Sequence, residues 1–250
     1  MKILGHAYIA TRAVDGDNQL LIAGAFLPEM LPYIPNDVFE YKEFHEGGRK
    51  LLEYLNKNYP EKRDLALGLL SYGVEFGADK FGKESEQLVG EKRSQLLREI
   101  SEANSVSREV AKIRLHNYVG LAIDWLLVQN EPELVKEVQK ILREVDIKEI
   151  SHLLAEEFKK NETKVRVMVE TLFKNFYRPE DLTSAEGLAR IWARQVSGLP
   201  EKDKVDIQKA SELIQDCADL LEGNWRSFLE STRIRVKENL QPFITGKKAQ

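Results

Sequence analysis

Six side chains of the types that bind divalent metals stand in short local patterns in the first half of the sequence. They are His6 in GHAYIA, Glu29 in GAFLPEM, His45 in FHEGG, Glu75 and Asp79 in YGVEFGADKF, and His116 in RLHNYVGLAID. Imidazole nitrogens and carboxylate oxygens are common protein ligands of zinc, manganese and iron. A metal site built from these side chains is therefore the first chemistry that the sequence suggests.

Glu75 and Asp79 have the most informative spacing. On a helix over residues 61–80, side chains four residues apart point the same way, about 6 Å along the axis, so both could grip one cation. Their neighbours are mostly apolar or small, and buried carboxylates are costly unless they are paired or metal-bound. Two ordinary interpretations remain open. Pairs of the form Glu-x-x-x-Asp are more often on solvated faces, and lone histidines on apolar faces are more often hydrogen-bonded core residues.

The composition describes a globular chain with no long-range attraction for polyanions. The 250 residues are 42% hydrophobic and 31% charged, with a net charge of −4, which excludes disorder and gives no strong signal for nucleic acid. The single cysteine, Cys217, excludes an internal disulfide. The longest apolar stretch, YVGLAIDWLLV, is too short to be a transmembrane segment. Because no signal peptide is recognisable, we expect a cytoplasmic protein.

Helical periodicity dominates the chain, and no stretch alternates with a period of two between hairpin turns. It predicts an all-α multi-helix bundle formed by a single domain over residues 1–250, in which 1–129 carry the metal ligands and 130–250 have no recognisable site. The expected helices are 4–14, 18–26, 40–58, 61–80, 87–103, 106–129, 131–144, 146–160, 162–177, 183–197 and 202–240. Residues 116–128 are apolar nearly all round, so we expect them at the centre of the bundle.

The order of the patterns resembles the all-helical superfamily of zinc-dependent phospholipases C and fungal single-strand nucleases. The similarity covers residues 5–128. It consists of a histidine near the N-terminus, Gly-Ala…Pro-acid, His-Glu, a Gly-Leu-Leu-Ser-Tyr segment that ends in an acid, and His-Asn opening the helix with AIDWLL. The resemblance implies a bundle of the phospholipase C and nuclease type that holds three metal ions, usually zinc. It also implies that Glu29, His45, Glu75 and Asp79 form one site, that His6 shares Asp79 in a second, and that His116 belongs to the last.

Three positions depart from the family pattern. Glu75 stands where a paired histidine is expected, Ser85 where the nucleases have another histidine, and Gly120 where an acid is expected. Asp124 lies two turns beyond His116, about 12 Å along a helix, which is too far to share one ion with it. We therefore expect a divalent metal, with zinc first by the resemblance. The excess of oxygen ligands shifts the preference toward manganese, iron or magnesium.

Two functions compete on this basis. In the first, the chain is a metal-dependent, phospholipase C-like phosphoester hydrolase that acts on a small phosphodiester or a phospholipid. The metal ions activate a water, which Glu29 and Asp79 orient or deprotonate. In the second, favoured by the missing acid at Gly120, the chain is a catalytically degenerate, non-enzymatic metal-binding or scaffold protein of the same fold. A third interpretation, which the sequence favours less than the first two, is a helical protein whose histidines are only core residues. The sequence leaves the oligomeric state open.

Overall fold

The computed structural model describes residues 2–29, 38–40, 43–44, 46–197 and 204–245. Every regular element within these ranges is helical, which confirms the all-α prediction. The α-helices are α1 (Ile3–Ala13), α2 (Asn18–Phe26), α4 (Gly48–Asn58), α5 (Arg63–Tyr72), α6 (Arg93–Asn104), α7 (Arg108–Asn130), α8 (Pro132–Glu144), α9 (Ile147–Phe158), α10 (Glu162–Glu170), α11 (Ala185–Ser197), α12 (Ile207–Leu221) and α13 (Trp225–Thr245). Three segments are 3₁₀-helical, namely η2 (Pro60–Lys62), η3 (Ala78–Lys92) and η5 (Pro179–Thr183), and one is π-helical, η4 (Thr171–Phe176).

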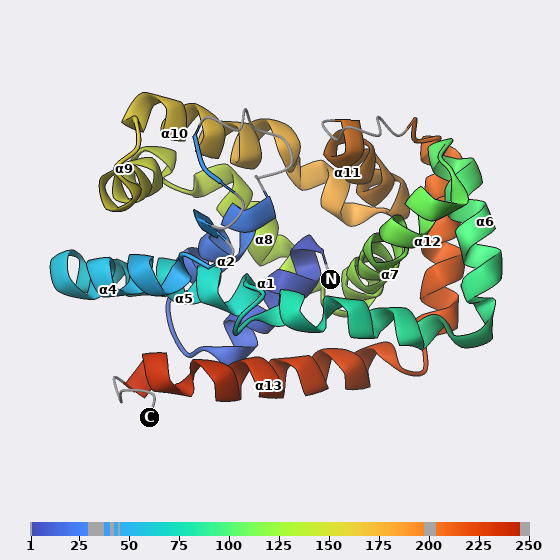
Figure 1. Ribbon diagram of the computed structural model, residues 1–250, viewed down its shortest axis with the longest axis horizontal. Coiled ribbons are helices and arrows are strands. Elements are labelled where there is room, and N and C mark those ends of the chain that lie inside the picture. Colours follow the sequence, from blue (N-terminus) through green and yellow to red (C-terminus); the bar gives the residue numbers. More distant parts are fainter. Residues whose placement is uncertain (1, 30–37, 41–42, 45, 198–203, 246–250) are drawn as a thin grey trace.

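Helix α1 lies inside the bundle, where it contacts α2, α5, α7, α8 and α13 (Figure 1). Helix α13 runs along one edge of the molecule, and α9 and α10 lie at the opposite edge. Buried apolar side chains from Ile3 to Leu240 form one continuous cluster, so helices from the two halves of the chain share a core. None of the described helices is both long enough and apolar enough to cross a membrane.

Helix α7 is central, as its apolar composition predicts. All side chains at positions 117–124 are buried, and the helix packs against α1, α6, α11 and α12. Ser107 caps its start, because the serine hydroxyl accepts a hydrogen bond from the backbone N–H of Val110 at 3.3 Å. This helix therefore connects the N-terminal helix with the C-terminal helices that surround it.

Helices α2 and α5 approach each other backbone to backbone at two glycines. A Cβ atom added to Gly24 would lie 2.0 Å from the carbonyl oxygen of Leu65, and one added to Gly68 would lie 2.1 Å from that of Leu21. No real Cβ atom can occupy either position, so the glycines set the distance between the helices. This contact fixes the end of α2, from which Glu29 follows, relative to the end of α5.

Several predicted helix boundaries are wrong. The helix expected over 61–80 ends at Tyr72, because the backbone of Gly73 leaves the helical region with ψ of 161°. The helix expected over 202–240 is two helices, separated by a turn that contains Gly223. The segment expected over 162–177 widens into the π-helical turn η4 after Glu170. Apolar periodicity continues through these breaks, since each following segment still turns an apolar side toward the core.

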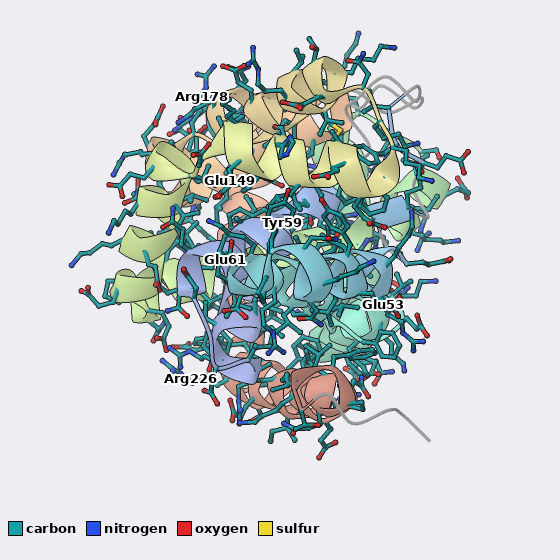
Figure 2. All side chains as sticks on the ribbon, turned by 90° about the vertical axis from the view of Figure 1, so that its left-hand side faces the viewer. Glu53, Tyr59, Glu61, Glu149, Arg178 and Arg226 are labelled. Atoms are coloured by element: carbon teal, nitrogen blue, oxygen red, sulfur yellow. The ribbon has the colours of Figure 1, made fainter. Side chains whose placement is uncertain are left out.

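Ion pairs and hydrogen bonds join the turn after α4 to helix α9. Figure 2 looks onto this side of the bundle, where Tyr59, Glu61 and Glu149 lie. The Tyr59 hydroxyl donates to Glu156 at 3.2 Å, and the Lys62 ammonium lies 2.7 Å from Glu149. These contacts are at the surface, where each contributes little to stability.

Candidate functional site

Glu29 is a buried carboxylate that is surrounded by hydrogen-bond donors. It follows α2 and is only 5% exposed. Its Oε1 accepts from the Tyr72 hydroxyl at 3.2 Å, and its Oε2 accepts from Gln195 Nε2 at 3.1 Å and from the Tyr177 hydroxyl at 3.5 Å. The Lys2 ammonium lies 3.8 Å from the same Oε2. The Glu29 charge is therefore balanced inside the protein, as a buried carboxylate requires.

His6 belongs to the same buried region. It lies on α1 with 1% of its surface exposed, and its ring stacks on that of Tyr72 with centroids 4.1 Å apart. The Tyr72 ring thus lies against His6 while its hydroxyl binds Glu29. Lys2, His6, Glu29, Tyr72, Tyr177 and Gln195 are called the Glu29 cluster below. Two of the residues predicted as metal ligands, His6 and Glu29, are thereby brought into one neighbourhood.

Glu75 and Asp79 do not share a helical face, contrary to the prediction. Glu75 lies in the turn after α5 with 51% of its side chain exposed, and its Oε1 is 3.1 Å from the guanidinium of Arg49. Asp79 lies in η3 and is partly exposed. The physical reason is the end of α5 at Tyr72, which removes the i,i+4 geometry on which the pairing depended.

His116 is a partly exposed side chain on α7. Burial lowers its pKa to about 3, and the positive charges of Lys2, Lys83 and Arg114 lower it further in the same direction. The imidazole is therefore neutral over the physiological pH range. Its surroundings are cationic, which is unusual for a position where a metal cation is expected to bind.

The described residues do not assemble the predicted metal site. Within these residues, no group of three or more histidine, cysteine, aspartate or glutamate side chains could hold a metal ion. His45, the remaining predicted ligand, lies outside the described residues. The donor set around Glu29 also fits a metal poorly, because two hydroxyls, one amide and one ammonium already surround its oxygens. The described part of the predicted ligand set thus does not fit a divalent cation.

Asp124 has a structural role that the sequence reasoning missed. Its carboxylate is fully buried on α7 and accepts the backbone N–H groups of Leu4 at 3.2 Å and Gly5 at 2.9 Å. It thereby caps the first turn of α1 from a position about 120 residues away in the sequence. Burial raises the pKa of Asp124 to about 7, although the two backbone N–H groups act in the opposite direction. The sequence signal that could have indicated this role was a single acidic residue within an otherwise apolar helical stretch.

A second polar network adjoins the Glu29 cluster at Trp192. The Trp192 indole N–H donates to Asn104 Oδ1 at 2.8 Å, and Asn104 Nδ2 donates to the Tyr118 hydroxyl at 2.8 Å. The Lys2 ammonium lies 5.7 Å from the centre of the Trp192 ring, and the Arg114 guanidinium carbon lies 6.0 Å from it. Lys2 therefore connects the two networks, with a carboxylate on one side and an indole ring on the other.

Sequence reasoning could not identify the partners of Glu29. Lys2, Tyr72, Tyr177 and Gln195 lie far apart in the sequence, and their residue types carry no metal or catalytic pattern. Gln195 is completely buried on α11, and none of the described residues hydrogen-bonds to its Oε1. A buried acceptor without a donor is uncommon in folded proteins.

Comparisons with models of protein families, with curated proteins and with solved structures found no match to this chain.

Proposed function

We propose that this chain is a catalytically degenerate, non-enzymatic protein that binds a small molecule at the Glu29 cluster. The observation that carries the proposal is the set of groups around the Glu29 carboxylate, which consists of two hydroxyls, an amide and the Lys2 ammonium. In this proposal the chain descends from the phospholipase C and nuclease type of helical bundle. The order of its sequence motifs supports that descent.

The position of Lys2 opposes a divalent cation at Glu29. A metal ligated by a carboxylate oxygen lies about 2 Å from that oxygen, whereas the Lys2 ammonium is already 3.8 Å from Glu29 Oε2. Two unit charges of like sign about 4 Å apart repel by about 4 kcal/mol near a protein surface, and a divalent ion doubles this cost. Lys2 thus takes the neutralising role that a metal has in a hydrolase.

The metal-dependent phosphoester hydrolase remains the second candidate. One observation favours it, namely that His6 and Glu29 both contact Tyr72 in the interior of the bundle. The position of Glu75 weighs against it, because this side chain is exposed and paired with Arg49. The hydrolase would therefore need a ligand set different from the one inferred from the sequence.

The two candidates are separated by measuring metal content and turnover on one preparation. We expect purified protein to contain less than one equivalent of zinc, manganese or iron, and a chelator to leave its melting temperature unchanged. We also expect no hydrolysis of chromogenic phosphodiesters or short-chain phospholipids when these metals are added. Glu75→Gln is the matched control for Glu29→Gln, since both remove one carboxylate. Stoichiometric metal that Glu29→Gln loses and Glu75→Gln keeps, together with turnover, would refute the proposal.

A further inference from the structure

The side chain of Arg194 joins two chain segments directly beside the residues that bind Glu29. Arg194 lies on α11 and precedes Gln195, whose Nε2 donates to Glu29 at 3.1 Å. The Arg194 Nε donates to the backbone carbonyl of Phe176 at 3.0 Å. Phe176 in turn precedes Tyr177, whose hydroxyl lies 3.5 Å from Glu29. The bond from Arg194 to Phe176 therefore ties the two segments together one residue away from both donors.

The two donors meet at one oxygen of Glu29 and also contact each other. Tyr177 and Gln195 both bind Oε2 of Glu29, and Gln195 Nε2 donates to the Tyr177 hydroxyl at 3.2 Å. Tyr177 and Gln195 are both completely buried. These three contacts can form together only if the segment after η4 lies at a set distance from α11. The Arg194 side chain spans that distance.

Asp181 holds the Arg194 guanidinium in place. This aspartate lies in η5 with 4% of its side chain exposed, and its Oδ2 is 2.5 Å from Arg194 Nη2. Its Oδ1 accepts from Arg190 Nε at 2.8 Å. A guanidinium is a planar, rigid fork, so fixing one of its nitrogens on a carboxylate also orients the others. With Nη2 on Asp181, the Nε of Arg194 is directed at the carbonyl of Phe176.

The sequence of α11 places Asp181 opposite both arginines. A Cβ atom added to Gly187 would lie 2.1 Å from the Asp181 carbonyl oxygen, so only glycine lets η5 lie this close to α11. Ser184 caps α11 there, because its hydroxyl accepts the N–H of Gly187 at 3.0 Å. Residues 187, 190 and 194 are spaced by three and four, so they share one helical face. The face that receives η5 thus carries both guanidinium groups.

We infer that Arg194 and Asp181 are positioning residues of the Glu29 cluster. Asp181 orients the Arg194 guanidinium, and the guanidinium sets the distance at which Tyr177 and Gln195 meet at Glu29. The inference rests on the proposed function in taking the Glu29 cluster as the functional site.

Fluorine nuclear magnetic resonance of the intact protein labelled with 3-fluorotyrosine tests this role. The chain has eight tyrosines, and Tyr177→Phe identifies the Tyr177 signal by its disappearance. In the wild type, Glu29→Gln should shift this signal, because it removes a charge beside the Tyr177 hydroxyl. Arg194→Gln should itself move the Tyr177 signal, and in that variant the response to Glu29→Gln should be lost. A role in stability alone would lower the melting temperature without moving the Tyr177 signal of the folded protein.

Two further variants separate position from charge. Arg190→Gln is the matched control, since it removes a guanidinium from the same Asp181 but keeps the bond from Arg194 to Phe176. It should leave the Tyr177 response to Glu29→Gln unchanged. Arg194→Lys keeps the positive charge beside Asp181, but an ammonium cannot reproduce the planar fork. It should therefore behave like Arg194→Gln, and it keeps the test decisive if Arg194→Gln does not fold.

Two results would overturn the inference. One is a Tyr177 signal that keeps its wild-type position and its response to Glu29→Gln in the folded Arg194 variants. The other is an equal loss of that response in Arg190→Gln, which would assign the effect to the charge near Asp181 in general. Either result leaves the proposed function intact. Metal-dependent turnover would instead remove the proposed function and leave the positioning role of Arg194 standing.

Discussion

Replacing Asp124 by alanine is expected to destabilise the fold by detaching the first turn of α1 from α7. The carboxylate accepts the N–H groups of Leu4 and Gly5 at 3.2 and 2.9 Å, and it is completely buried. Alanine leaves both N–H groups in the interior without an acceptor. Because Lys2 precedes this turn directly, the substitution should also disturb the place where Lys2 meets Glu29.

The size of the effect follows from the two lost acceptors. A buried donor left without a partner costs about 1–3 kcal/mol, so two of them give a loss of about 2–6 kcal/mol in the free energy of unfolding. Entry of water into the vacated space would place the result at the lower end of this range. Burial raises the pKa of Asp124 to about 7, so the carboxyl is only partly ionised at neutral pH, and the expected loss counts the two hydrogen bonds alone. An asparagine side chain at this position would retain one acceptor oxygen, and Asp124→Asn should therefore cost about half as much as Asp124→Ala.

Urea denaturation followed by circular dichroism measures this loss at constant pH. Asp15→Ala is the matched control, because Asp15 is an exposed aspartate just after α1, and surface substitutions of this kind change stability by less than about 0.5 kcal/mol. If Asp124→Ala lowers the free energy of unfolding no more than Asp15→Ala does, the carboxylate is not the cap of α1. The same conclusion follows if Asp124→Asn costs as much as Asp124→Ala.

Three further predictions concern the same core. Because the pKa of Asp124 is raised in the folded state, its stabilising contribution is complete below about pH 4 and is lost as the pH rises through about 7. In urea titrations, the difference in the free energy of unfolding between wild type and Asp124→Asn should therefore shrink from about pH 4 to about pH 7. The pKa of His116, lowered to about 3, has the opposite sign, so its contribution is complete above about pH 6.5 and is lost toward pH 3. Its ring protons should show no titration by nuclear magnetic resonance between neutral pH and about pH 5. Gly68→Ala should cost about 1–3 kcal/mol, since its Cβ would lie 2.1 Å from the Leu21 oxygen, while Gly223→Ala, with no atom within 4 Å, should change little.

The helical class and the central position of α7 could be predicted from the sequence because both follow from local apolar periodicity. The ends of helices were less predictable, since an apolar stripe continues across a break when the next segment packs on the same core. Gly73 and Gly223 illustrate this point, because each marks a break that periodicity alone does not register. A glycine within an apolar stretch has two meanings, a close approach as at Gly68 or a break as at Gly73, and only the packing partner distinguishes them.

Local patterns also misjudged the surroundings of the predicted ligands. Glu75 has apolar neighbours in the sequence, yet its partner Arg49 comes from α4, 26 residues earlier. Glu29 was predicted as a metal ligand and catalytic residue, whereas the partners that the structure gives it come from α5, α11 and the segment after η4. No short sequence motif marks a tyrosine or a glutamine as the hydrogen-bond partner of a buried carboxylate. A buried carboxylate can be neutralised in several ways, and the sequence does not say which one applies.

Asp124 shows how an unpredicted partner of a buried charge can also determine where a helix begins. The helical spacing places this acid about 12 Å from His116 along the axis, and the sequence offered no other role for a charged residue in the core. In the folded chain the acid holds the start of α1, and the start of α1 is what places Lys2 between Glu29 and Trp192. The ammonium then lies 3.8 Å from the Glu29 carboxylate inside the bundle. The same contact that anchors the N-terminal helix thus also positions the ammonium that balances the buried charge of Glu29.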